Sequence, residues 1–247
     1  MDVQKLYIST IDPNARFIAR KYDLGLEIAD FCYAYNMDEG FCQMDALVRK
    51  KLEGIRRRLF HGPFSELFPC AIDLKARALA ADRFRQAIFL AAGYGAKNIV
   101  LHGGFLPYGY FPQWYVEQSI LFWKGFLADM PEDVSIFLEN VLEPEPEMLR
   151  DIVEAVGDAR LGLCLDIGHA NVYGKRSLED WLSCCGPYLE HVHIHNNDGT
   201  RDTHGDLMTG TIPIKPFLNR LGEKCPEATV TLEISEAEAS VEWLLEA

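Results

Sequence analysis

The stretch HVHIHNNDGTRDTH, residues 191–204, holds four of the seven histidines of this chain. In an extended segment, side chains alternate between two faces. His191, His193 and His195 would therefore point one way, while Val192 and Ile194 point the other. Imidazole is the side chain that most commonly binds metal ions in proteins. The pattern fits either an edge strand with its histidines in water or a strand that turns them into a polar site, and the stretch alone leaves both open.

Eight short apolar or alternating runs recur along the chain, separated by segments of helical pattern. The runs are 6–10, 24–30, 57–62, 98–104, 135–140, 161–168, 191–196 and 229–234. The helical candidates are 13–22, 43–53, 73–94, 112–129, 145–156, 177–184, 213–222 and 236–246. Parallel strands need crossover helices, and eight of them close a ring, so we expect an α/β fold, a (β/α)8 TIM barrel. We expect one domain over residues 1–247.

A doubly wound open sheet is the structural alternative to the barrel. No glycine-rich dinucleotide loop follows the first run, which favours the barrel.

Composition narrows the classes of protein to consider. No apolar run reaches the length of a membrane span, and the N-terminus lacks a charged-then-apolar leader pattern. The seven cysteines are scattered, with no CxxC pair, which is typical of free thiols in a reducing cytoplasm. With a net charge of −13, the surface does not attract nucleic acid by bulk electrostatics, although a local patch or metal ions would still allow it.

Six of the eight runs carry a potential metal ligand at or near their C-terminal end. These residues are His61, His102, Glu139, Asp166, His193 and Glu233. Each has apolar neighbours, so alternation turns the neighbours outward under the helices and the polar group inward. The C-terminal ends of barrel strands are where active sites of this architecture form. Uncompensated charge at one mouth would cost several kcal/mol or more, and a divalent cation is the simplest compensation.

Two further pairs have local ligand spacing. Asp166 and His169 are three apart in LDIGHAN, where we expect the strand to open into a loop. Asp202 and His204 are two apart in the loop after the seventh run. A set of nitrogen and oxygen ligands without cysteine suits Zn, Mn, Mg or Co, and we expect no organic cofactor. Glu27, in the second run, fits either the site or the lower layers of the barrel.

Taken together, these motifs resemble the xylose isomerase-like barrel superfamily. The segments that carry the resemblance are HGPF (61–64), LHGG (101–104), LEN (138–140), LDIGHAN (165–171), HVHIHNNDG (191–199), DTH (202–204) and LEI (232–234). That superfamily holds sugar and sugar-phosphate isomerases and epimerases together with abasic-site nucleases of the endonuclease IV type. The resemblance implies a shared four-ligand metal site made of Glu139, Asp166, His193 and Glu233. It also implies positions that complete a three-zinc cluster in the nuclease branch, namely His61, His102, His169, Asp202 and His204.

Our first hypothesis is a metal-dependent isomerase or epimerase that acts on a sugar or sugar phosphate. Glu139 and Glu233 would act as acid and base on a metal-stabilised enediolate, and His169 would orient or polarise an oxygen. Aromatic residues in 105–115 would form a wall of the site, unless they only pack a loop. We expect no membrane partner, and a homo-oligomer remains open.

The alternative hypothesis is a zinc phosphoester hydrolase resembling endonuclease IV. The presence of all nine ligand positions favours it. The acidic composition and the short loops after the first runs favour the isomerase, and the basic clusters 49–51 and 56–58 precede the third strand, away from the site. Asn196 stands where many relatives carry Asp. A third hypothesis is a sugar- or metal-binding barrel without activity.

Overall fold

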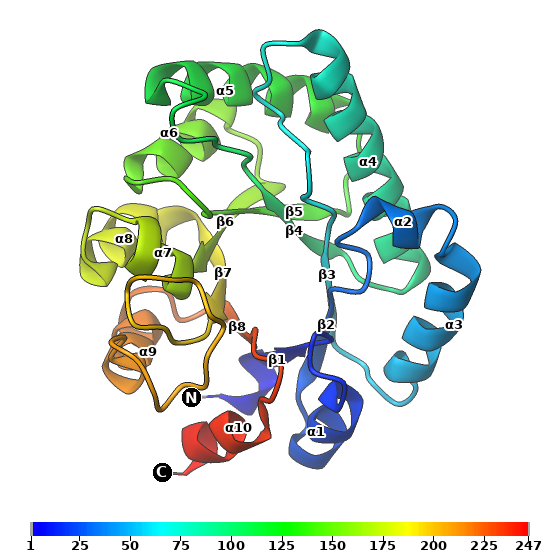
Figure 1. Ribbon diagram of the computed structural model, residues 1–247, viewed down its shortest axis with the longest axis vertical. Helices are drawn as coiled ribbons and strands as arrows, with labels where there is room; N and C mark the ends of the chain where they lie inside the picture. Colours follow the sequence, from blue (N-terminus) through cyan, green and yellow to red (C-terminus); the bar gives the residue numbers. More distant parts are fainter. Residues whose placement is uncertain (1, 247) are drawn as a thin grey trace.

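Eight parallel strands close into a barrel in which each strand pairs with the next in chain order and β8 pairs with β1 (Figure 1). The computed structural model describes residues 2–246, so residues 1 and 247 of the expected domain lie outside the described residues. The strands are β1 Leu6–Ser9, β2 Gly25–Ile28, β3 Arg58–His61, β4 Asn98–His102, β5 Ser135–Glu139, β6 Leu161–Asp166, β7 Leu189–Ile194 and β8 Thr229–Leu232. The predicted (β/α)8 TIM barrel is confirmed, and the open doubly wound sheet is wrong.

The helices surround the barrel as an outer ring (Figure 1). They are α1 Ala15–Tyr22, α2 Ala34–Met37, α3 Phe41–Leu52, α4 Leu74–Gly93, α5 Pro112–Ala128, α6 Glu147–Val156, α7 Ile167–Tyr173, α8 Leu178–Cys185, α9 Ile214–Lys224 and α10 Glu238–Leu245. Two 3-10 turns, η1 Val3–Lys5 and η2 Gly186–Tyr188, precede β1 and β7. Among residues 2–246, no helix combines the length and apolar character that a membrane crossing requires.

The segment after β6 differs from the expectation. We expected a loop after Asp166, but α7 begins at the very next residue. Asp166 is the N-cap of α7, and its Oδ1 accepts a hydrogen bond from the backbone N–H of His169 at 2.7 Å. A side-chain acceptor at the N-cap satisfies a backbone donor that would otherwise be free. His169 therefore lies on a helix, which fixes its backbone.

Alternation along the strands divides the buried residues into two sets. Outward-facing apolar residues join the helices in one large core. Inside the barrel, a smaller apolar layer contains Tyr7, Leu59, Val100, Phe137 and Cys164. The last four lie two positions before His61, His102, Glu139 and Asp166. Because side chains repeat every second residue, the polar groups stand directly above this apolar layer, at the C-terminal ends of the strands.

Packing between α4 and α5 provides a test of the core. Phe84 is 1% exposed and stacks on Trp123 with ring centroids 5.8 Å apart. We predict that Phe84→Ala lowers the free energy of unfolding, measured by urea titration, by about 3–5 kcal/mol, because it leaves a cavity. Phe89 is on the same helix but 66% exposed, so Phe89→Ala should change stability by less than about 1 kcal/mol. Equal losses in the two variants would contradict this packing.

Candidate metal centre

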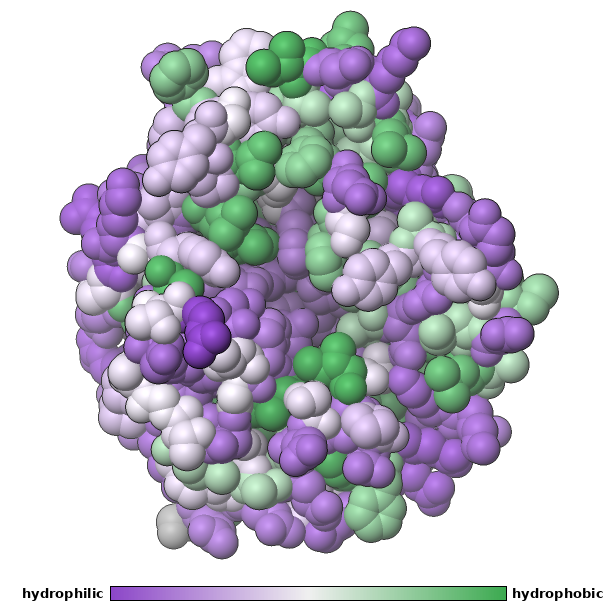
Figure 2. All heavy atoms as spheres, in the orientation of Figure 1, coloured by the Kyte–Doolittle hydropathy of each residue, from purple (hydrophilic) through white to green (hydrophobic). Residues whose placement is uncertain are grey.

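The polar residues gather at the mouth of the barrel, where Figure 2 shows a hollow at the centre of the ring with hydrophilic surface inside it. Strand register brings neighbouring groups together. His102 is paired with Glu139, and Asp166 is paired with His193. Glu233 directly follows the end of β8. The candidate residues that are far apart in the sequence are therefore neighbours in space.

Four of them form what we call the central group: Glu139, Asp166, His193 and Glu233. Their ligand atoms all lie within 4.8 Å of one another. His193 Nδ1 is 3.3 Å from Glu139 Oε1 and 3.3 Å from Glu233 Oε2. It is 3.9 Å from Asp166 Oδ2. One imidazole nitrogen thus faces the buried carboxylates of Glu139 and Asp166 and the partly buried carboxylate of Glu233.

A second group, the inner histidine group of His61 and His102, shares Glu139 with the central group. His61 Nε2 and His102 Nε2 each lie 3.2 Å from Glu139 Oε2. The other oxygen of this carboxylate, Oε1, faces His193 Nδ1 and lies 3.4 Å from His169 Nδ1. Glu139 therefore lies between two pairs of histidine nitrogens, and each of its carboxylate oxygens contacts one pair.

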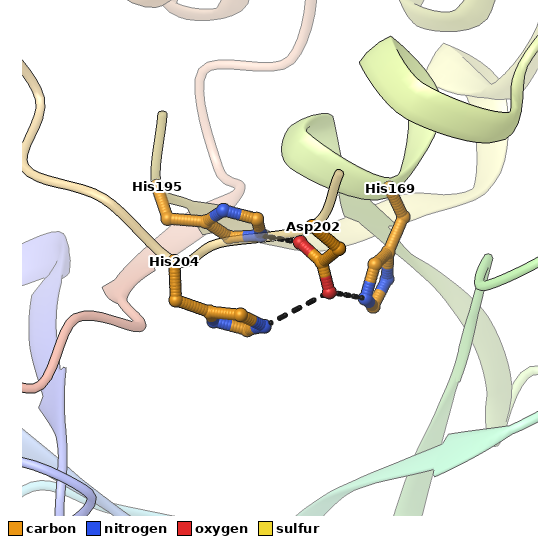
Figure 3. A group of neighbouring side chains, drawn as sticks. All are labelled: His169, His195, Asp202 and His204. Atoms are coloured by element: carbon orange, nitrogen blue, oxygen red, sulfur yellow. Dashed lines mark hydrogen bonds and ion pairs between the residues drawn. The ribbon is translucent and has the colours of Figure 1, made fainter. Parts of the chain in front are cut away.

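Figure 3 shows a third set, the outer group of His169, Asp202 and His204, with His195 beside it. Asp202 Oδ2 lies 3.2 Å from His169 Nε2 and 3.1 Å from His204 Nε2. His204 has a φ of 45°, in the left-handed region that is uncommon for residues other than glycine. Backbone held in this region is often associated with functional sites.

Hydrogen bonds determine which nitrogen of three histidines carries the proton. Nδ1 of His61, His169 and His204 lies 2.9 Å from a backbone carbonyl oxygen in each case. A carbonyl only accepts, so Nδ1 carries the hydrogen and the neutral ring presents a lone pair on Nε2. Each Nε2 faces a carboxylate oxygen, another acceptor, so a proton or a cation must lie between them. Metal-bound histidines have this arrangement, with the second ring nitrogen donating to a carbonyl or carboxylate.

The electrostatics of the mouth indicate surplus negative charge. Within residues 2–246, the ion pairs of Glu139, Asp166 and Glu233 are formed with histidines and with no lysine or arginine. Burial raises the pKa of Glu139, but His193 and His102 outweigh it and hold this pKa well below its usual range. Burial also raises the pKa of Asp166, yet neighbouring imidazoles lower it to about 2.

The same charge acts on the histidines. Burial lowers the pKa of His193, but the negative groups around it outweigh this and raise that pKa well above its usual value. The carboxylates therefore remain charged, and only protonated imidazoles balance them. A divalent cation would supply the same positive charge. Three carboxylate oxygens and one imidazole nitrogen form a donor set that fits Mn, Mg, Co or Zn, whereas the histidine-rich groups are better suited to Zn.

Of the two positions that the sequence allowed for Glu27, the structure shows the lower one, below the mouth of the barrel. Glu27 Oε2 accepts hydrogen bonds from His191 and Thr231. Its Oε1 is 3.0 Å from His193 Nε2. This is an ion-pair distance without hydrogen-bond geometry, so Glu27 places negative charge beneath the His193 ring while Nδ1 of that ring faces the central group.

Asn196 organises the loop that carries Asp202 and His204. Its side-chain nitrogen donates to the carbonyl oxygens of Leu207 and Ile212 at 3.2 and 3.1 Å. Its backbone pairs with Gly205 in an antiparallel bridge. An aspartate here could not donate to those two carbonyls, so the amide is the side chain that this loop conformation requires.

The aromatic segment 105–115 is divided between packing and surface. Phe105 and Tyr115 are buried and in edge-to-face contact, and the Tyr115 hydroxyl donates to Glu143. Tyr108 and Phe111 are exposed. Packing therefore explains part of this segment, and its exposed members remain available to line a binding site.

His195 also lies at the mouth, although the sequence did not identify it as a candidate ligand. It is completely buried, and its Nε2 lies 3.1 and 3.2 Å from the two carboxylate oxygens of Asp166. The sequence did contain a signal, since His195 shares one face of an extended segment with His193. The strand ends at Ile194, so alternation alone did not determine where this ring points.

Comparison with known proteins agrees with the architecture. Residues 19–247 match the family model described as xylose isomerase-like TIM barrel. An uncharacterized protein of Methanocaldococcus jannaschii is 31% identical over 203 residues, which are 75% of this chain and 68% of that protein. A probable endonuclease 4 of Mycobacterium ulcerans is 25% identical over 174 residues, 66% of this chain and 67% of that protein.

Two solved structures have similar folds over 98% of this chain and 96% of theirs. A Thermus thermophilus protein, from a crystal soaked with ZnCl2, is 26% identical with a TM-score of 0.79. A D-tagatose 3-epimerase-like protein has a TM-score of 0.80 at 23% identity, a level that shows the fold alone. The closed barrel, the polar groups at its mouth and the match over residues 19–247 lead to one conclusion: this chain belongs to the xylose isomerase-like TIM barrel family.

Proposed function

We propose that this protein is a divalent-metal-dependent isomerase or epimerase of sugars or sugar phosphates. The observation that carries the proposal is the central group, in which two buried carboxylates and the partly buried carboxylate of Glu233 surround His193 Nδ1 at the mouth of the barrel. Zinc was soaked into crystals of the Thermus thermophilus relative, and an epimerase-like protein shares the fold. Both agree with a metal-dependent reaction on a sugar.

Glu139, Asp166, His193 and Glu233 are the residues that we propose as ligands. A bound divalent ion would supply a Lewis acid that stabilises negative charge on a carbonyl oxygen of the substrate. Such a reaction moves a proton away from a carbon next to that carbonyl. The proton then returns to the neighbouring carbon in an isomerase, or to the opposite face of the same carbon in an epimerase.

Glu139 and Glu233 are the proposed base and acid. They come from β5 and from the end of β8, and each lies 3.3 Å from His193 Nδ1. The two carboxylates therefore approach the central group from different strands, as a proton donor and an acceptor on two sides of a substrate require. His169, held by its Nδ1–H bond to the carbonyl of Asn140, would orient or polarise a substrate oxygen.

The first prediction from the proposed function concerns proton transfer. Glu139→Gln keeps a side-chain oxygen at this position but removes the base, so exchange of a substrate C–H with D2O should fall about 10²–10⁴-fold. Exchange would be followed by NMR across a panel of aldoses, ketoses and their phosphates. Asp198→Asn is the matched control, because Asp198 is an exposed carboxylate of the loop after β7. Unchanged exchange in Glu139→Gln, with normal metal content, would show that this mechanism is wrong.

The second prediction concerns metal content. Protein purified without chelators or a metal-binding tag should contain about one divalent ion per chain in the central group, measured by elemental analysis. Chelation should lower the melting temperature, and adding the ion back should restore it, because an ion that binds only the folded state stabilises that state. A folded protein that takes up no divalent ion would contradict the proposed site.

A zinc phosphoester hydrolase is the second candidate function. The observation that favours it is that all nine ligand positions meet at the mouth, where the inner histidine group and the outer group flank the central one. The relative described as a probable endonuclease 4 agrees with it. The net charge of −13 and the position of the basic residues favour the sugar reaction. Arg58 begins β3, at the end of the strand opposite the mouth, and donates to the carbonyls of Tyr94 and Ile55.

The third prediction separates the two functions. Zinc-loaded protein at low salt should leave a DNA duplex with an abasic site intact, because the acidic surface gives the phosphate backbone little attraction. The products would be resolved on a denaturing gel. Cleavage that a chelator abolishes and zinc restores would make the hydrolase the better description of this protein.

A further inference from the structure

His195 lies close to both the central group and the outer group. Its Nε2 lies 3.1 Å from Asp166 Oδ1 and 3.2 Å from Asp166 Oδ2, but 3.6 Å from Asp202 Oδ1. The ring is completely buried. Distance alone would allow two roles, since the same nitrogen is close enough to the outer group to join His169, Asp202 and His204 around one ion.

Ring orientation argues against a role as a ligand. The rings of His195 and His204 are stacked, with centroids 4.0 Å apart and an angle of 13° between their planes (Figure 3). The lone pair of an imidazole nitrogen lies in the plane of its ring, so two nearly parallel rings cannot both direct lone pairs at one ion between them. His169 lies at 81° to His204, an angle at which the two lone pairs can converge.

The hydrogen-bond partners of His195 lead to the same result. The three histidines discussed above have Nδ1 fixed to a backbone carbonyl, which leaves Nε2 as the free lone pair. Among the described residues, Nδ1 of His195 has no hydrogen-bond partner. Nothing holds the hydrogen on Nδ1, whereas the carboxylate of Asp166 accepts a hydrogen from Nε2. A hydrogen bond to an ionised acceptor is about twice as strong as one between neutral groups.

We propose that His195 is a positioning residue that donates from Nε2–H to Asp166 and directs this carboxylate toward the central group. Asp166 Oδ1 already accepts from the backbone N–H of His169 at 2.7 Å. The His195 hydrogen lies between the two oxygens of Asp166, 3.1 Å from Oδ1 and 3.2 Å from Oδ2 as measured from Nε2. Oδ1 therefore has two donors, whereas Oδ2 shares only the His195 hydrogen. Oδ2 also faces His193 Nδ1 and is the oxygen more available to a metal ion.

The position of His195 is itself tightly fixed. A Cβ added at Gly168 would lie 1.9 Å from His195 Cε1, so only glycine at this position of α7 leaves room for the ring. His204 covers the ring by stacking. Because His204 belongs to the outer group and Asp166 to the central group, His195 links the two.

This inference rests on the metal site of the proposed function, and its test measures metal binding without activity. Mn²⁺ is the probe, because it prefers the oxygen-rich central group, and the EPR signal of free Mn²⁺ reports the bound fraction. His195→Leu removes the donor. His195→Gln keeps one, since the glutamine amide nitrogen reaches the place of Nε2. We expect Mn²⁺ affinity to fall about 10–100-fold in His195→Leu and to stay close to the wild-type value in His195→Gln.

Each other outcome overturns the inference in a recognisable way. Wild-type affinity in His195→Leu would show that the contact with Asp166 does not matter. Equal losses in both variants would overturn the donor role. A zinc content lower by one ion per chain in both, measured by elemental analysis, would then identify His195 as a ligand, because an amide nitrogen does not replace an imidazole. A wild-type protein that binds no Mn²⁺ would overturn the proposed metal site as well. If His195→Leu does not fold, His195→Asn replaces it, because its amide is too short to reach Asp166.

Discussion

The charge on Glu139 is the constraint on which the arrangement of the mouth depends. Its carboxylate is completely buried, and four imidazoles lie within 3.4 Å of its two oxygens, two at each. An isolated buried carboxylate would be costly, so this one requires positive charge around it. The barrel surrounds it with imidazole nitrogens from β3, β4, α7 and β7. Glu139 thereby contacts side chains from elements that are far apart in the sequence. The same surplus of negative charge makes the mouth suitable for a divalent ion.

Much of this architecture followed from the period of two along the strands. Leu59 and His61 alternate with the outward Phe60, and Phe137 and Glu139 alternate with the outward Leu138. This pattern predicted which strand residues face inward, whereas the alternation of eight such runs with helical segments predicted the closed barrel. It could not predict α7, because that helix depends on the side chain of Asp166 accepting from the His169 backbone, a contact that spacing alone does not reveal.

The sequence also could not predict the orientations of individual histidine rings. Whether a histidine is a ligand or a donor depends on which of its nitrogens meets a carbonyl, and the carbonyls that hold His169 and His204 come from distant strand ends. The same limit applies to His195, which stands just beyond the regular alternation of β7. These details need the folded backbone. They also separate the nitrogens that can bind metal from the one that we infer to hold Asp166 in place.

The measurement that tests the central claim most directly is anomalous X-ray diffraction from crystals grown with Mn²⁺, with data collected on both sides of the manganese absorption edge. The account predicts an anomalous peak at ordinary ligand distances, about 2.0–2.3 Å, from oxygens of Glu139, Asp166 and Glu233 and from His193 Nδ1. A peak confined to the outer group, or no peak in a crystal whose mouth is otherwise ordered as described, would contradict it.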